Sequence, residues 1–229
     1  HKNGGTIKSL LSRPLSHYHK LIFSLTNLSS QGFYQNQYNK YNNIYLYIDY
    51  LDLHKPYSYS IYFLSNNGNY EQNGGIENYT TIVSPDLLTT YLDNANTRLK
   101  RRVFNFNHRF QLTKKNIIEH NFKFTSFNRV FSDLGSQSYF YDLFNYSNSD
   151  FYQNDTKINS FYTDFSLNTH YVNLGLSHYL YQTNIFNVNT FYDILVSAQA
   201  IRKLNNDNNF MLKFKYCPIG LNSNDYNIN

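Results

Sequence analysis

Long stretches of this chain alternate apolar and polar residues one by one, and this pattern limits the folds that it can adopt. No stretch shows the i, i+3, i+4, i+7 apolar spacing of a capped helix. In residues 103–112 one face carries the apolar side chains of Phe104, Phe106, Phe110 and Leu112, and the other carries Asn105, Asn107, Arg109 and Gln111. Alternation of this kind is typical of a β-strand with one apolar and one polar face.

The next run along the chain repeats the pattern. Residues 118–127 place Ile118, Phe122 and Phe124 on one face and Glu119, Asn121, Lys123 and Thr125 on the other. The polar segment 113–116 between the two runs predicts a tight turn. The two runs therefore predict a hairpin whose faces differ in polarity.

Further alternating runs give about ten strands in all. They cover residues 42–50, 57–63, 161–168, 172–180, 186–193 and 210–216, with breaks at 54–56, 168–170, 182–184 and 205–209. The strands are near the 9–11 residues that cross a bilayer when tilted, whereas strands of soluble proteins more often have 5–6. Periodicity alone does not separate a membrane barrel from a soluble β-sandwich, since both alternate.

The predicted connections alternate between short and long. Short ones lie near 114–115 and 182–183, and long polar loops are expected at 65–98 and 132–157. Outer-membrane barrels have short turns on one side and long loops on the other. Tyrosines cluster near strand ends, as in a membrane-interface belt, although the aromatic surface of a soluble sheet or codon bias explains the excess equally well: Tyr38, Tyr41, Tyr50, Tyr57, Tyr70, Tyr139, Tyr141, Tyr179 and Tyr181.

Composition excludes several classes of protein. A single cysteine excludes a disulfide framework, and the absence of any 18-residue apolar run excludes a transmembrane helix. Aromatic residues make up 19% of the chain, which argues against disorder. The net charge of +5 is too diffuse for a nucleic-acid partner. The one basic run, 98–102, is predicted to be a solvated strand end, with binding of a headgroup phosphate as the second interpretation.

No pattern of catalytic or cofactor-binding residues is present, so we predict neither an enzyme nor a cofactor. There is no nucleophile elbow, P-loop or dinucleotide fingerprint. His17 and His19 are two residues apart and would share a strand face, but a polar or interfacial pair is favoured over a metal site. His108 falls among phenylalanines, and Cys217 is expected to be a small hydrophobic residue.

Three segments form a recognisable pattern: Gly32–Gln37 after a strand, Tyr70–Ile76 after the strand 57–64, and Asp93–Arg98 before the strand 103–112. In that order and spacing they resemble the porin family of Bacteroidetes outer membranes. The resemblance is clearest over residues 6–133 and implies a β-barrel pore without catalytic residues. Gly74 and Gly75 suit a loop that needs positive φ, and we expect Ala95 and Arg98 to pack the return of the loop, with Arg98 reaching a carboxylate or the lumen.

We therefore predict an all-β, antiparallel, up-and-down transmembrane barrel of about ten or more strands, formed by residues 1–229 as one domain and representing the C-terminal or middle part of a longer barrel. It would lie in the outer membrane, contact lipid and let small hydrophilic solutes or ions diffuse passively. The predicted pore-lining residues are Asn105, Asn107, Arg109, Glu119, Asn121, Lys123, Lys213 and Lys215. Two alternatives stay open: a soluble, aromatic-rich β-sandwich that binds a ligand such as a carbohydrate, and a barrel with a structural or adhesive role.

Overall fold

The computed structural model describes residues 4–32, 34–75, 88, 90–92, 94–133, 152–169, 172–183, 189–203, 209–219 and 226–228. Its strands are β1 (Gly4–Pro14), β2 (His19–Ser30), β3 (Asn39–Leu51), β4 (Tyr57–Gln72), β5 (Ala95–Gln111), β6 (Ile117–Asp133), β7 (Tyr152–Asn168), β8 (Val172–Thr183), β9 (Asn189–Lys203), β10 (Asn209–Ile219) and β11 (Tyr226–Ile228). Within these ranges no helix is long and apolar enough to span a membrane.

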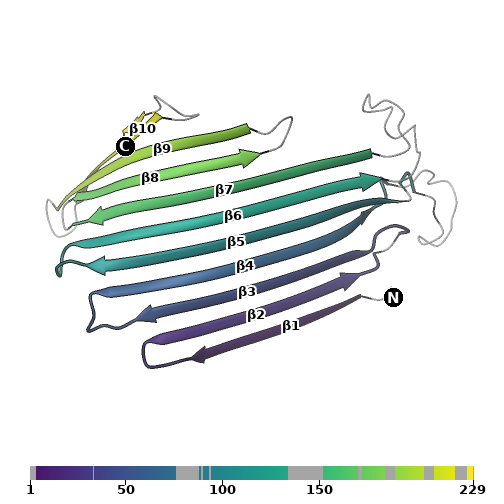
Figure 1. The fold of residues 1–229 in the computed structure, drawn as a ribbon, viewed down its shortest axis with the longest axis horizontal. Helices are drawn as coiled ribbons and strands as arrows, with labels where there is room; N and C mark the ends of the chain where they lie inside the picture. Colours follow the sequence, from purple (N-terminus) through teal and green to yellow (C-terminus); the bar gives the residue numbers. More distant parts are fainter. Residues whose placement is uncertain are drawn as a thin grey trace.

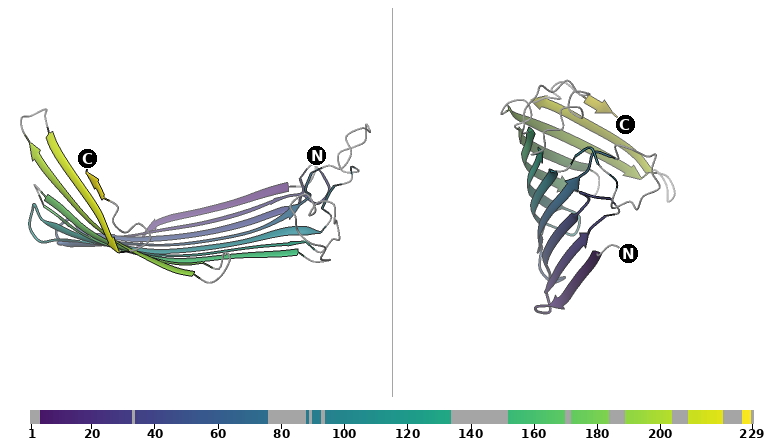
Figure 2. Two further views of the ribbon diagram at one scale, coloured as in Figure 1. Left: turned by 90° about the horizontal axis from the view of Figure 1, so that it is seen from above. Right: turned by 90° about the vertical axis from the view of Figure 1, so that its right-hand side faces the viewer.

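All eleven described strands belong to one sheet, in which each strand pairs with its neighbours in the sequence (Figure 1). Neighbouring strands pair antiparallel from β1 through β11. Figure 2 shows this sheet as a single layer that twists and curves along its length. The predicted all-β, up-and-down architecture is confirmed. Among the described strands, β1 pairs with β2 alone, so the sheet has an open edge there.

The predicted hairpin of residues 103–127 forms as β5 and β6. Its turn closes where Thr113 Oγ1 accepts hydrogen bonds from the backbone N–H groups of Lys115 at 3.3 Å and Asn116 at 3.1 Å. Threonine and aspartate side chains often replace a backbone partner in this way, because their oxygens reach amides two or three residues ahead. Asp52 does the same between β3 and β4, where its Oδ1 accepts the N–H of His54 at 2.9 Å.

The connections between β1 and β2, β3 and β4, and β5 and β6 are short and lie at one end of the sheet, whereas the longer ones between β2 and β3 and between β4 and β5 lie at the other (Figure 1). We call these the short-turn end and the long-loop end. Residues 15–18, 52–56 and 112–116 connect strands at the short-turn end, whereas 31–38 and 73–94 connect them at the long-loop end. This is the asymmetry that outer-membrane barrels show.

The loops predicted at 65–98 and 132–157 are too long. β4 continues to Gln72 and β5 begins at Ala95, while β6 continues to Asp133 and β7 begins at Tyr152. Both faces of these strand extensions are largely polar, so alternation gives no sign of them. The break predicted at 182–184 is also misplaced, because β8 runs through Thr183, and the strand predicted at 186–193 is β9 from Asn189 to Lys203.

The longest strands reach past the predicted apolar segment at the long-loop end. β5, β6 and β7 each have 17 residues, more than the 9–11 that cross a bilayer. In β5 the apolar alternation ends at Phe104, nine residues after the strand begins at Ala95. The sheet therefore has an apolar segment near its short-turn end and a polar extension at its long-loop end.

Candidate functional site

The two faces of the sheet differ in polarity along most of its strands. We call the face that carries Asn105, Asn107 and Arg109 of β5 the polar face, and the opposite one, with Phe104 and Phe106, the apolar face. The register pairs Asn105 with Lys123, Asn107 with Asn121, and Arg109 with Glu119. Six of the eight predicted pore-lining residues are thus neighbours on the polar face: Asn105, Asn107, Arg109, Glu119, Asn121 and Lys123.

Hydrogen bonds join polar-face side chains across the middle strands. Asn105 is only 7% exposed, and its Nδ2 donates to Asn121 Oδ1 at 2.7 Å. Asn121 stands opposite Asp164 of β7, whose Oδ1 accepts from Ser177 Oγ at 2.6 Å. A buried polar group is stable when it finds such a partner. Asp164 and Ser177 are not among the predicted pore-lining residues, although both lie at polar positions of alternating runs.

Charged side chains of both signs lie toward the short-turn end of this face. Arg109 Nε is 3.7 Å from Glu119 Oε1, with the two side chains 50% and 43% exposed. Glu119 Oε2 also accepts from Asn168 Nδ2 at 3.1 Å. Exposed pairs of this kind add little stability because water screens them. Their main effect is on the local electrostatic potential of the polar face.

Tyrosines divide between the faces, which corrects part of the predicted belt. Tyr50 and Tyr57 lie near the short-turn end of the apolar face, where Tyr50 stacks on Tyr59 with ring centroids 5.4 Å apart. Tyr179 and Tyr181 instead lie on the polar face and stack on one another at 6.1 Å. They stand on that face because the alternation of β8 fixes it, so a position near a strand end does not identify a belt residue.

The apolar face carries a continuous row of large side chains across neighbouring strands. The row runs from β1 to β8 through Leu11, Phe23, Leu46, Phe63, Phe104, Phe124, Phe161 and Leu180. Neighbouring members contact one another, as where the tilted rings of Phe124 and Phe161 have their centroids 4.7 Å apart. We call the apolar residues from this row to the short-turn end the apolar band.

The exposure of adjacent residues is the reverse of that in a water-soluble protein. Phe104 is 37% exposed, whereas its neighbour Asn105 is 7% exposed. Phe165 and Leu176, opposite each other on β7 and β8, are 52% and 51% exposed. Large contiguous apolar surfaces of this kind mark sites that contact lipid or another protein.

A chain of hydrogen bonds crosses the apolar band. His108 Nε2 and His120 Nδ1 are 2.9 Å apart, and His120 Nε2 is 2.9 Å from Thr163 Oγ1. Phe106 stacks on His108 and Phe165 on His120, with ring centroids 5.0 and 4.2 Å apart. The expected placement of His108 among phenylalanines is confirmed, and its hydrogen bond lowers the cost of a polar group in apolar surroundings.

The three segments that carry the family resemblance meet at the long-loop end. Asn36 Nδ2 donates to Thr90 Oγ1 at 3.3 Å and to the Leu92 carbonyl at 3.2 Å, so the first segment binds the chain just before the third. Asn73 Nδ2 reaches the Gln35 carbonyl at 3.4 Å, and the Leu92 N–H donates to the Asn73 carbonyl at 3.0 Å. We call this group of segments the loop cluster.

Glycine and small buried residues allow the loop cluster to close. Gly74 and Gly75 have φ angles of 64° and 99°, as expected for a loop that needs positive φ. A Cβ on Gly74 would lie 2.8 Å from Leu92 Cγ. Leu92 and Ala95 are 3% and 2% exposed, and Ala95 begins β5. The expected role of Arg98 is wrong: this side chain is exposed on the apolar face, because β5 has already begun and its alternation directs residue 98 away from the polar face.

The remaining predicted positions have mixed outcomes. His17 lies in the turn before β2, whereas His19 is the first residue of that strand, so the two do not share a strand face. The part of the chain that the structure describes holds no group of three or more metal-binding side chains. The backbones of Lys213 and Lys215 in β10 pair with those of Gln199 and Ser197 in β9. Cys217 lies in β10.

Comparison with known proteins gives a match in fold only. No family model matches this sequence, and no curated protein matches it. Among solved structures, the ferric-catecholate import receptor Fiu from E. coli K12, in its open form, superposes with a TM-score of 0.68 at 8% sequence identity. The match covers 93% of this chain and 43% of Fiu, so this chain spans less than half the length of that receptor.

The match relates the sheet to part of a membrane barrel. Fiu is an import receptor, and the predicted location in the outer membrane agrees with a match to an outer-membrane barrel and with the exposed apolar side chains on the strands. At 8% sequence identity the match shows a common strand arrangement, and it assigns no role to any residue of this chain.

Proposed function

We propose that this chain forms part of an outer-membrane β-barrel, with its apolar face against lipid and its polar face around an aqueous interior. The reversed exposure of Phe104 and Asn105 carries the proposal, because that arrangement is favourable only if the phenylalanine side of the sheet meets an apolar phase. Closure of the sheet, by further strands or by another part of the protein, would satisfy the backbone groups at its edges, which lipid cannot do.

Passive diffusion of small hydrophilic solutes is the activity that this arrangement supports. The side chains proposed to line the interior remain Asn105, Asn107, Arg109, Glu119, Asn121, Lys123, Lys213 and Lys215. Amides supply hydrogen bonds to a hydrated solute, and charges of both signs select weakly among ions. With a net charge of +5, the chain would favour anions slightly.

Conductance tests this activity directly. The full-length protein is inserted into a planar bilayer, and we expect steady, ohmic channels whose reversal potential in a salt gradient is shifted slightly toward that of the anion. Absence of channels from protein that has demonstrably inserted would contradict passive diffusion. Swelling of liposomes in sugars of increasing size would then give the limiting solute.

Import of a bound ligand is the second candidate function, and the fold match favours it. Fiu is described as a ferric-catecholate import receptor, and its strands superpose on most of this chain. A receptor of that kind would conduct poorly by itself and would bind its ligand from the long-loop side. Ligand-dependent quenching of tyrosine fluorescence, without ohmic channels, would favour this candidate over a porin.

Membership of the porin family of Bacteroidetes remains a proposal that rests on the three segments of the loop cluster. Their hydrogen bonds to one another make these three segments one structural unit in this chain. A soluble sandwich is disfavoured because the described strands form one sheet and so offer no second layer for the apolar face. Extraction from membranes by detergent, but not by salt, separates the barrel from the sandwich.

A further inference from the structure

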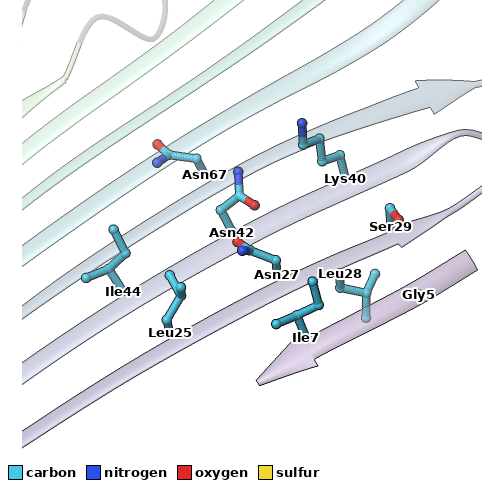
Figure 3. A pocket seen from close by; sticks show the side chains of 10 residues that line it. All are labelled: Gly5, Ile7, Leu25, Asn27, Leu28, Ser29, Lys40, Asn42, Ile44 and Asn67. Carbon is cyan, nitrogen blue, oxygen red and sulfur yellow. The ribbon is translucent and has the colours of Figure 1, made fainter. Parts of the chain in front are cut away.

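A groove crosses strands β1 to β4 on the apolar face, at the boundary between the apolar band and the polar extension of the sheet. Its volume is about 570 Å³. Leu25 and Ile44 line it toward the short-turn end, and Lys40 lines it toward the long-loop end, with Asn42 between (Figure 3). One groove therefore offers an apolar floor and a cationic rim.

Basic side chains continue this rim onto β5. The groove is bounded by Asn67, which pairs with Lys100 in the next strand. Arg98, Lys100 and Arg102 occupy alternate positions and thus share the apolar face, and all three are exposed. None of the three has a hydrogen bond or ion pair within the described ranges of the chain. We call Arg98, Lys100 and Arg102 the basic ladder.

The spacing of the strands brings Lys40 and the ladder within reach of one ligand. Asn69 of β4 pairs with Lys40 on one side and with Arg98 on the other. Two strand spacings separate their backbones by about 10 Å. Lysine and arginine side chains are long enough to converge over that distance on a group between them.

The ladder begins immediately past the edge of the apolar band. Arg102 is two residues beyond Phe104, which is about 7 Å along a strand or about 5 Å along the membrane normal at barrel tilt. Lys100 is about 10 Å out by the same geometry. Headgroups occupy roughly 5–8 Å on each side of the hydrocarbon core. The backbone of Arg102 would thus lie at headgroup depth when the band is in lipid, and the long side chain of Lys100 would reach back to that depth from just beyond it.

Carboxylates on this part of the face do not neutralise the ladder. Glu71 Oε2 accepts the N–H of Tyr38 at 2.8 Å, at the edge of the loop cluster. Asp155 of β7 stands two strands away from Arg98, across Val130, which is the same spacing as that of Lys40 on the other side. Lys40 and the three cations of the ladder outnumber these two carboxylates, so the rim keeps a positive charge and its complement is an anion.

We propose that the groove and the basic ladder bind a lipid of the outer leaflet through its phosphate group. Acyl carbon would lie on Leu25 and Ile44, while Lys100 and Arg102 would hold the phosphate, which arginine contacts through two parallel N–H groups. Lys40 and Arg98 would approach the phosphate from farther out through their long side chains. The ladder faces outward at the long-loop end, which in a barrel is the outer surface of the membrane. This inference rests on the proposed membrane function and adds a ligand to it.

The test compares two triple variants of the full-length protein by native mass spectrometry in detergent. Arg98→Gln/Lys100→Gln/Arg102→Gln removes the ladder, and Arg101→Gln/Arg129→Gln/Lys114→Gln removes three charges from the polar face and the short-turn end. Phosphatidic acid is the probe. We expect the ladder variant to bind it roughly a hundredfold more weakly, or about fivefold per charge, and the control to bind as the unchanged protein does.

Two further probes identify the source of the phosphate and its chemistry. Diacylglycerol with the same acyl chains should bind weakly to all three proteins, and inorganic phosphate at millimolar concentration should not displace the lipid. Raising NaCl from about 0.1 M to about 1 M shortens the Debye length from about 10 to about 3 Å and should weaken lipid binding by the unchanged protein, even if a variant fails to fold.

Equal lipid binding by the two triple variants would overturn the inference, as would displacement by inorganic phosphate or insensitivity to salt. Flotation of each protein with neutral lipid vesicles is measured alongside. A protein that does not float contradicts the proposed membrane barrel itself. A protein that floats but binds phosphatidic acid independently of the ladder contradicts only the lipid site.

Discussion

The apolar and polar faces of the β5–β6 hairpin have the same backbone geometry but opposite surroundings. On one face the rings of Phe104 and Phe122 have their centroids 6.3 Å apart, and both side chains remain partly exposed. On the other, Asn105 and Asn121 are joined by a 2.7 Å hydrogen bond. The hairpin therefore leaves apolar side chains exposed on one face and joins polar side chains by hydrogen bonds on the other. Substitutions on the two faces should accordingly have different consequences.

The largest effect is expected from a charge placed in the middle of the apolar band. Phe106→Lys should lower the free energy of unfolding in lipid vesicles by about 2–4 kcal/mol, the cost of a lysine near the bilayer midplane. Its neighbour on the polar face supplies the control, since Asn107→Lys should change stability by less than about 1 kcal/mol. Urea titration of the vesicle-inserted protein measures both, and equal losses would mean that the faces do not differ.

A smaller loss is expected when the buried amide pair of the polar face is broken. Asn105→Ala removes the donor to Asn121 and should cost about 1–3 kcal/mol, because a buried acceptor then lacks its partner. The double variant Asn105→Ala/Asn121→Ala removes both groups and should cost less than the sum of the single variants. Strict additivity in this double-mutant cycle would show that the two amides do not interact.

A local effect is expected in the loop cluster. Gly74→Ala puts a Cβ 2.8 Å from Leu92 Cγ at a φ of 64°, and the strain should amount to about 1–3 kcal/mol. We expect faster cleavage of residues 73–94 in limited proteolysis of the intact protein, with unfolding of the sheet unchanged. Gly5→Ala, where a Cβ would meet nothing within 4 Å, is the control and should be cleaved like the unchanged protein.

The smallest effect on stability, but a measurable one on selectivity, is expected at the exposed ion pair. Glu119→Gln should alter stability by less than about 0.5 kcal/mol, since water screens its contact with Arg109. Loss of the carboxylate should shift the reversal potential toward anions in planar bilayers. An unchanged reversal potential, with channels still present, would place Glu119 away from the ion path.

Alternation predicted the strands where it was strong and missed their ends where it was weak. Residues 103–111 and 118–124 have one apolar and one polar face, so their strands and the turn at 113–116 could be predicted from the sequence. The extension 95–102 is basic and polar on both faces, and pairing with β4 extends the strand there. Hydrogen bonds to a neighbouring strand depend on the tertiary structure, so the pattern of a single sequence does not predict how far they lengthen a strand.

The candidate site could be predicted only in part for the same reason. Positions on the polar face of β5 and β6 followed from periodicity. The loop cluster and the groove depend on which strands are neighbours and on register, as when Asn69 joins Lys40 to Arg98. Tyr179 and Tyr181 alternate with the apolar Leu180, and this alternation predicts that both tyrosines lie on the polar face. Their position near a strand end does not show which face they occupy.

The orientation of the two faces toward lipid and water is the central claim, and accessibility of spin labels tests it most directly. With Cys217 replaced by Ser, labels are placed at Phe104→Cys and Asn107→Cys of β5, and the full-length protein is reconstituted in vesicles. We predict that oxygen, which concentrates in lipid, relaxes the label at 104 more strongly, and that a water-soluble nickel complex relaxes the label at 107. Equal access of the nickel complex to both labels, or the reverse order, would contradict the account.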